Sequence, residues 1–244
     1  MSDVQASTHT TAPPPRRHSA LPSALALLPA AAAGSVLYFI GDLAVQHVLR
    51  PSYDPMRAFV STFVIGRYGS LQVVAFFALA VGLLCLAVGL RRVLPTSMWL
   101  RAGLLLLVVC GVAAALAGAF TTDLPGTDST VSGIVHAVAG DIGYLALVGA
   151  MLAVSLHLAG DQRWRRLFGW SAGLALLGVV TLTAMFLTLD TVIAGLTQRL
   201  FGLTTFAWLL LVSIALLQAV LSPGQPQPWR ALLSARAERT TRTG

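Results

Sequence analysis

The chain has 244 residues, of which 56% are hydrophobic and only 10% are charged. Soluble domains usually carry about 25% charged residues, so this composition excludes an ordinary soluble globule and suits a protein whose solvent is lipid. All 16 basic residues are arginines that lie almost wholly between apolar runs. They form no basic stripe with interleaved aromatic residues, so we expect no nucleic-acid partner.

Six apolar runs follow one another along the chain, each with about the 20 residues that cross a ~30 Å hydrocarbon core. Lipid cannot satisfy backbone amides, so we expect an all-α polytopic membrane protein with six transmembrane helices in one bundle. Pro29 predicts a kink in the first span, which we expect to be retained and not cleaved as a signal peptide. The expected spans are 23–49, 68–90, 99–120, 131–158, 167–189 and 200–221.

The segments between and around these spans are polar or too short to cross a membrane. The apolar half of the first loop, 56–65, is expected to lie in the interface or to fold back as a short helix. Residues 190–199 are expected to form a loop that can extend either neighbouring helix. The domain division is a disordered cytoplasmic tail at 1–20, a transmembrane domain at 21–222 and a Pro- and Arg-rich cytoplasmic tail at 223–244.

The distribution of arginines predicts the orientation of the bundle. Twelve lie in the two tails and in the second and fourth loops, and four lie in the other loops. The positive-inside rule then places both termini in the cytoplasm of a multi-pass protein of the cell membrane. Cys85 and Cys110 fall in the middle of apolar runs, where buried free thiols are expected.

Two carboxylates lie deep in the expected spans. Asp42 is about 10 Å below the outer end of its helix, and Asp141 is roughly 12–15 Å deep, at a rise of ~1.5 Å per residue. A carboxylate in hydrocarbon costs about 2.5 kcal/mol or more on insertion scales, so we expect both to face the bundle interior with a partner.

Other polar residues gather near the same outer face, and together they predict an outward-facing polar pocket. Outer arginines suit an anionic headgroup, and His136 and Asp123 would fix the pocket. The expected ligand-binding residues are Asp42, His47, Asp123, His136, Asp141, Tyr144, Arg67 and Arg199.

Structural roles compete with each of these assignments. A lone intramembrane Asp can be protonated and bonded to a neighbouring helix, and His136 can be an interhelical hydrogen bonder. Zinc would need His47, Asp123 and His136 to converge, and neither HExxH nor GxSxG is present. We therefore assign no catalytic residue, metal or cofactor.

A run of motifs resembles domain-of-unknown-function family 998, a prokaryotic family of six-span membrane proteins. The motif stands here as Phe120-Thr121-Thr122-Asp123-Leu124-Pro125, followed eleven residues after Pro125 by His136-Ala137. Gln198-Arg199-Leu200 before Trp208 resembles the start of the family's last span. The resemblance covers about residues 24–220, implies six spans, and carries over only Asp123, Pro125 and His136. The family is itself distantly similar to the Frag1/DRAM/Sfk1 group, which acts around lipids and membrane organisation.

The leading expectation is a non-enzymatic membrane protein that binds a lipid headgroup, a small solute or a protein partner. The first alternative is a proton-coupled transporter of small solutes that uses Asp42 and Asp141. The second is a membrane-embedded lipid hydrolase with His47, Asp123 and His136 at one point. The sequence indicates membrane lipid as a partner and does not indicate an oligomeric state.

Overall fold

The computed structural model describes residues 21–222, and all regular structure in that range is helical. The expected tails, 1–20 and 223–244, lie outside the described residues. Six described helices are long and apolar enough to cross a membrane, so the predicted six-span all-α fold is confirmed. The elements are α1 (Leu21–Leu49), η1 (Val60–Val64, a 3-10 helix), α2 (Gly69–Val93), α3 (Met98–Ala119), α4 (Val131–Gly160), α5 (Arg165–Leu187) and α6 (Ala194–Leu221).

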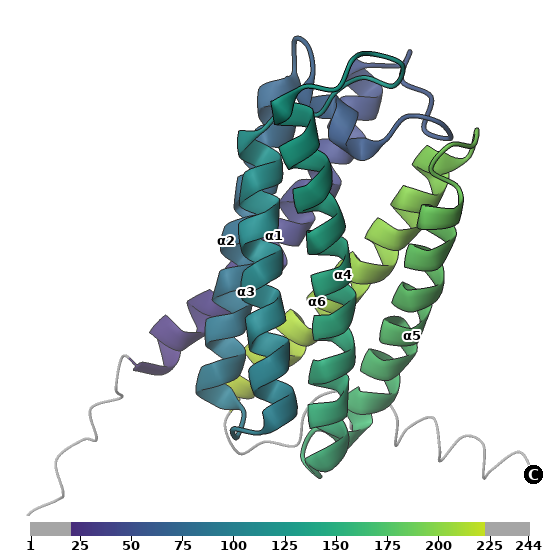
Figure 1. The fold of residues 1–244 in the computed structure, drawn as a ribbon. Helices are drawn as coiled ribbons and strands as arrows, with labels where there is room; N and C mark the ends of the chain where they lie inside the picture. The colour runs from purple at the N-terminus through teal and green to yellow at the C-terminus, as the bar shows by residue number, and fades with distance from the viewer. Residues whose placement is uncertain (1–20, 223–244) are drawn as a thin grey trace, which may run out of the picture.

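The six long helices form a closed ring. Each helix packs against the next along the chain, and α6 returns to pack against α1 (Figure 1). The helix α6 is strongly tilted and crosses behind α4 in this view. In its lower half it comes close to α2, where Leu216 lies against Gly89. This tilt fills the centre of the ring at one end of the bundle only.

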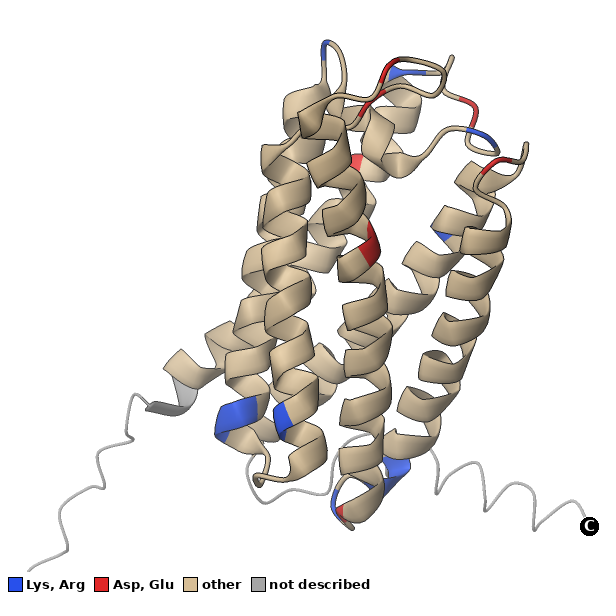
Figure 2. Cartoon of the chain, viewed as in Figure 1, with Lys and Arg blue, Asp and Glu red and all other residues tan. Residues whose placement is uncertain are grey.

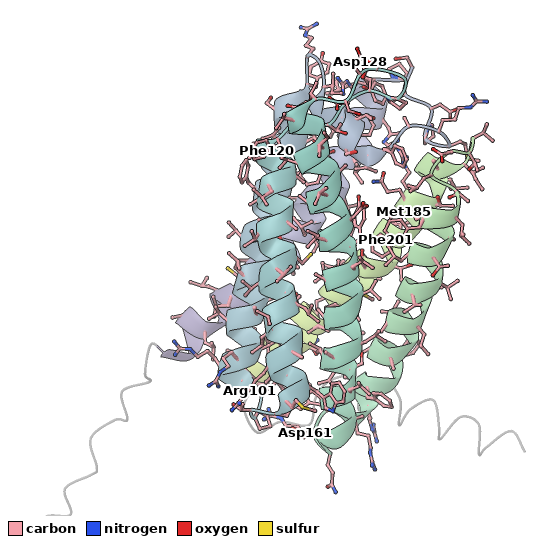
Figure 3. All side chains as sticks on the ribbon, viewed as in Figure 1. Arg101, Phe120, Asp128, Asp161, Met185 and Phe201 are labelled. Carbon is pink, nitrogen blue, oxygen red and sulfur yellow. The ribbon has the colours of Figure 1, made fainter. Side chains whose placement is uncertain are left out.

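The bundle has two distinct ends. The upper end, as drawn, carries the loops 50–68, 120–130 and 188–193, and the lower end carries the short loops 94–97 and 161–164. Figure 3 shows Asp128 at the upper end and Arg101 and Asp161 at the lower end. Between the ends, large apolar side chains such as Leu27, Leu105 and Val180 are exposed on the outside of the helices. Figure 2 shows that most charged positions lie at the two ends, as lipid solvation of the middle requires.

Local sequence signals explain where two of the helices begin. The hydroxyl of Ser97 accepts the Leu100 amide at the start of α3, and the hydroxyl of Thr130 accepts the Gly133 amide at the start of α4. The helix α1 continues through Pro29 without a break. Both cysteines are free, as expected, but only Cys110 is buried and Cys85 is half-buried.

The last and the first loops each take an arrangement that the sequence allowed. The helix α6 begins at Ala194, so the second half of the expected loop 190–199 extends this helix. The apolar half of the first loop contains η1, a short helix that folds back over the ring. Both arrangements bring polar side chains to the top of the bundle interior.

A chain of hydroxyl groups joins three helices in the lower half. The indole nitrogen of the fully buried Trp208 donates to the hydroxyl of Ser171 at 2.8 Å. That hydroxyl lies 2.6 Å from the hydroxyl of Ser155, which donates to the carbonyl of Met151. The helices α4, α5 and α6 are therefore hydrogen-bonded to one another inside the lower half of the bundle.

Candidate functional site

A cavity of about 320 Å³ lies in the upper half of the ring. Its walls come from α1, α2, α3, α4 and α6, and residues of η1 border it above. The first half of α6 forms one of its walls, through residues such as Phe201 and Phe206. Its volume falls at the lower end of the ~300–1,000 Å³ typical of ligand pockets.

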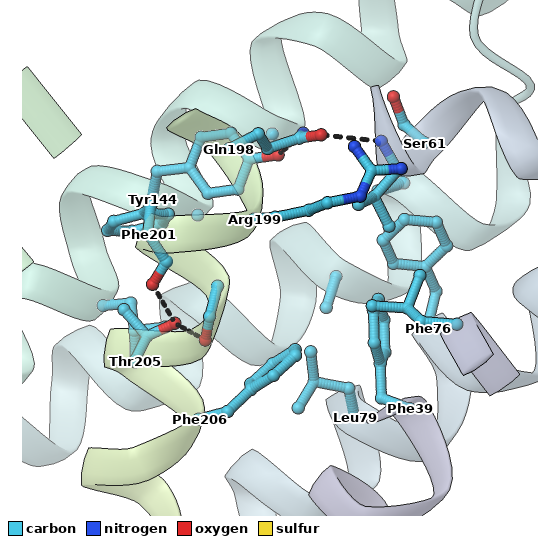
Figure 4. A pocket seen from close by; sticks show the side chains of 18 of the residues that line it. Phe39, Ser61, Phe76, Leu79, Tyr144, Gln198, Arg199, Phe201, Thr205 and Phe206 are labelled. Carbon is cyan, nitrogen blue, oxygen red and sulfur yellow. Dashed lines mark hydrogen bonds between the residues drawn. The ribbon is translucent and has the colours of Figure 1, made fainter. Parts of the chain in front are cut away.

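The walls of this cavity are mainly apolar. Phe39 meets Phe76 edge-on with ring centroids 5.6 Å apart, and its centroid is 5.2 Å from that of Phe206. Figure 4 shows these three rings and Leu79 together at one end of the cavity. Such walls offer no hydrogen bonds, so this end suits a hydrocarbon group better than a polar solute.

The other end of the cavity is bordered by a cation, Arg199 of α6. Its Nη1 donates to the backbone carbonyls of Pro55, Ala58 and Gly195 at 2.9, 2.7 and 2.9 Å. Its Nη2 donates to Nε2 of His47 at 3.2 Å, while its Nε is buried without a hydrogen-bond partner. The one ion pair among the described residues does not involve Arg199. The groups that directly hold the guanidinium are therefore neutral, and the carboxylate that acts on it, Asp54, does so without a direct contact.

The proton position on His47 follows from its two neighbours. Its Nδ1 lies 2.6 Å from the carbonyl of Leu43, which can only accept, so Nδ1 carries the proton. In the neutral ring Nε2 then has a free lone pair, and this lone pair receives the Arg199 donor. The ring also meets Phe63 of η1 edge-on, with centroids 5.1 Å apart. A neutral His47 thus fixes the guanidinium between α1 and α6.

Gln198 joins three parts of the upper bundle and was not among the expected site residues. Its Oε1 accepts the Val60 amide at 2.7 Å, and its Nε2 donates to the hydroxyl of Tyr144 at 2.9 Å. Tyr144 in turn meets Phe201 edge-on at 5.3 Å. Gln198 was left out of the expected site because residues 190–199 were expected to form a loop. Its position next to Arg199 in the sequence could have indicated that it belongs to the site.

The cavity is open on its membrane-facing side. Two of its lining residues, Ala44 of α1 and Leu203 of α6, are exposed, Leu203 to 60%. They lie one helical turn below His47 and Arg199, respectively. The opening therefore lies between α1 and α6, at a depth that lipid chains occupy.

His136 lines the cavity and also ties α3 to α4. Its Nδ1 lies 2.9 Å from the carbonyl of Ala117 and 2.8 Å from that of Phe120, so Nδ1 carries the proton. The ring is 6% exposed and meets Phe76 edge-on. This is the interhelical bonding that the sequence offered as the structural alternative for His136.

The Asp of the Phe-x-x-Asp-x-Pro motif braces the loop before α4. Asp123 accepts the Thr130 amide and the Thr130 hydroxyl, each at 2.8 Å. A side chain on Gly133 would collide with this carboxylate. Nearby, the Ser132 hydroxyl donates to the Thr121 carbonyl. The motif therefore holds α3 and α4 at a fixed spacing, and Asp123 does not line the cavity.

A comparison with models of protein families gave a match to this chain. The model of the family described as "Protein of unknown function (DUF998)" matches residues 32–215, more than half of the chain. This chain is a member of the DUF998 family. Searches of the curated proteins and of the solved structures found no match.

Four of the eight expected site residues of this DUF998 protein line the one cavity: His47, His136, Tyr144 and Arg199. Arg67 does not, because it is exposed at the upper end and lies over the ring of Tyr68. Of these two outer arginines, the structure therefore brings Arg199 to the cavity and leaves Arg67 away from it.

The two intramembrane carboxylates do not share a space. Asp42 is buried, 7% exposed, but it lies on the face of α1 toward α2 and does not line the cavity. Asp141 is exposed on α4, in the first half of that helix, and no described residue bonds to it. The expected inward orientation is therefore wrong for Asp141, because the face of α4 toward α3 is occupied by His136 and small residues such as Ala139.

No group of three or more His, Cys, Asp or Glu side chains in residues 21–222 is arranged to hold a metal ion. His47 and His136 both line the cavity, but Asp123 is committed to Thr130 in the loop above. The three residues of the hydrolase alternative thus do not meet at one point of the DUF998 cavity.

Proposed function

We propose that this protein binds an anionic membrane lipid, with an acyl chain in the apolar end of the cavity and the headgroup at Arg199. The observation that carries the proposal is the half-buried Arg199, which no carboxylate contacts directly and whose Nε has no acceptor. The nearest carboxylate, Asp54 of the first loop, attracts the guanidinium from a distance and pairs directly with Arg57. A cation in surroundings of low polarity is stabilised by an anion, and a guanidinium suits phosphate oxygens.

The shape of the cavity supports the same ligand. The aromatic walls at Phe39, Phe76 and Phe206 suit hydrocarbon, and the opening at Ala44 and Leu203 faces the membrane. A lipid could enter sideways from the bilayer, leaving its headgroup beside the guanidinium. A water-soluble solute would have to cross the bonded layer of η1, Gln198 and Arg199 above.

The transporter alternative receives no comparable support. It needs Asp42 and Asp141 in one cavity, and neither residue lines the cavity described here. The hydrolase alternative lacks the convergence of His47, Asp123 and His136. Lipid binding uses only the residues that do come together.

Native mass spectrometry of the full chain in detergent tests the proposal directly. Dioleoyl phosphatidylglycerol is titrated against dioleoyl phosphatidylcholine, and we expect one phosphatidylglycerol per chain to bind preferentially. Charge-assisted hydrogen bonds contribute about 1.5–3 kcal/mol, so Arg199→Gln should weaken phosphatidylglycerol binding roughly 10- to 100-fold. Equal binding of the two lipids to the unsubstituted protein would overturn the proposal.

Two further variants separate the contribution of the lipid headgroup from that of the acyl chain. Arg67→Gln removes an exposed cation from the same end and should leave the preference unchanged. Ala44→Trp narrows the opening and leaves the guanidinium in place, so it should weaken the binding of both lipids to a similar degree. If Arg67→Gln acts as strongly as Arg199→Gln, the preference comes from general surface charge and not from the cavity.

A further inference from the structure

A second group of polar side chains is buried between α1 and α2, on a different face of α1 from the cavity. It consists of Asp42 and Gln46 of α1 and Gln72 of α2, which are 7%, 0% and 0% exposed. None of the three lines the lipid cavity. Four of their atoms are buried without a hydrogen-bond partner: Oδ2 of Asp42, Oε1 of Gln46, and Nε2 and Oε1 of Gln72.

The packing of the two helices places these side chains at one level. The helices run antiparallel, with Phe39 against Phe76 below. Above, the Nε2 of Gln46 donates to the carbonyl of Tyr68 at 3.1 Å, which leaves its Oε1 free. Gln72 lies between these two contacts along α2, opposite the turn of α1 that ends at Gln46. Asp42 begins that turn, and its carboxyl group lies within hydrogen-bonding reach of the Gln46 side chain. All three side chains are therefore buried at one level of the α1–α2 interface.

The unpartnered atoms are mostly acceptors. Three are oxygens and one is a nitrogen, and exchanging the two ends of the Gln72 amide would not change that balance. The nearest arginine along α1, Arg50, is bonded instead to the carbonyls of Phe63 and Ile65. The carboxylate therefore has no counter-charge from the described side chains.

We propose that Asp42, Gln46 and Gln72 form a binding site for a monovalent cation such as Na⁺ or K⁺. One carboxylate balances one positive charge, whereas a divalent ion would leave a net charge in a medium of low dielectric constant. Carboxylate and amide oxygens are the ligands that hard cations take, and a single ion serves all three acceptors. A water molecule donates only two hydrogen bonds and leaves the carboxylate charge in place.

Thermal unfolding of the purified full chain tests this site. The protein is prepared in N-methyl-D-glucamine chloride, which is then replaced by NaCl or KCl at constant ionic strength and pH. Binding to the folded state alone should raise Tm saturably, by about 5–10 °C at 100 times Kd for a chain of this size. Retention of radioactive ²²Na⁺ or ⁸⁶Rb⁺, as a K⁺ substitute, should reach one ion per chain.

Matched variants locate the effect. Asp42→Asn should abolish the salt-specific rise in Tm, and Gln72→Met, which keeps the charge and the volume, should weaken apparent cation affinity by about tenfold, the loss of one ligand. Asp54→Asn, an exposed carboxylate paired with Arg57, should change neither result. Identical Tm values in all three salts would overturn the proposal, and so would a Tm that responds to pH but not to the cation. Lipid binding measured on the same samples keeps this outcome separate from the proposed function.

Discussion

Arg199 in the last helix donates to the Nε2 of His47 in the first helix at 3.2 Å, and this bond closes the ring of helices at its upper end. The two residues are separated by most of the chain, yet they lie side by side because α6 returns to α1. The same guanidinium holds Pro55 and Ala58 of the first loop. Ring closure, loop position and the proposed lipid headgroup therefore depend on one side chain.

The hydrogen bond between His47 and Arg199 gives the first prediction. His47→Phe keeps a planar ring but leaves the Nη2 of Arg199 without its acceptor. An unsatisfied, partly buried donor costs about 1–3 kcal/mol, so Tm should fall by several degrees. His47→Gln offers an oxygen at a similar distance from the backbone and should recover most of the loss. Equal Tm values for the two variants would show that the bond contributes nothing to stability.

The sequence predicted the number of spans and most of their boundaries, because a run of apolar residues is a direct consequence of solvation by lipid. It left the start of α6 open between residues 190 and 200, since Thr197, Gln198 and Arg199 look polar in isolation. In the fold they bond to η1, to the first loop before it and to the end of α5, and only the Nε of Arg199 is left without an acceptor. Polarity alone cannot distinguish a loop from a helix end that packs against a loop.

The candidate site was less predictable than the fold. Depth along a helix can be read from the sequence, but the direction of a side chain depends on which helices are neighbours. Asp42 and Asp141 are both deep, yet one lies in the α1–α2 interface and the other is exposed on α4. The apolar lining could not be predicted either, because Phe39 and Phe206 look like any other lipid-facing residues in the sequence.

The family motif gives a second prediction, about stability. Asp123→Ala removes two hydrogen bonds to Thr130 at the start of α4, which should cost about 1–2 kcal/mol, as the loss of a helix cap does. Asp128→Ala is the matched control in the same loop, since Asp128 is exposed and no bond ties it to the described residues. Thermal unfolding should therefore separate the two variants. A larger loss in Asp128→Ala would contradict this role for the motif.

A third prediction concerns the close packing of Gly133 against the carboxylate of Asp123. In Gly133→Ala the new methyl group would overlap Asp123, so the loop must shift and Tm should fall. Gly140→Ala on the same helix meets only the ring of Tyr144, at an ordinary 3.8 Å, and should be neutral or slightly stabilising. If the collision is the cause, combining Gly133→Ala with Asp123→Ala should give less than the sum of the two losses.

Orientation in the membrane gives a fourth prediction. Twelve of the 16 arginines lie in the two tails, in the lower loops or in the helix ends beside those loops, so the upper end should face away from the cytoplasm. With Cys85 and Cys110 replaced by Ala, Asp128→Cys should react with a membrane-impermeant maleimide in intact cells. Arg163→Cys, in the loop at the other end, should react only after permeabilisation. The opposite labelling pattern would place the lipid opening in the cytoplasmic leaflet.

The exposed Asp141 gives the last prediction. A carboxylate facing lipid near mid-membrane disfavours insertion by about 2.5–3.5 kcal/mol, whereas Leu favours it slightly. Asp141→Leu should therefore raise Tm and leave phosphatidylglycerol binding unchanged, because Asp141 does not line the cavity. Ile142→Leu, at the neighbouring exposed position, is the control and should change neither quantity. A lower Tm or weaker lipid binding in Asp141→Leu would mean that the carboxylate has a partner, such as a second copy of the chain or the lipid itself. Asp141 would then belong to the functional site.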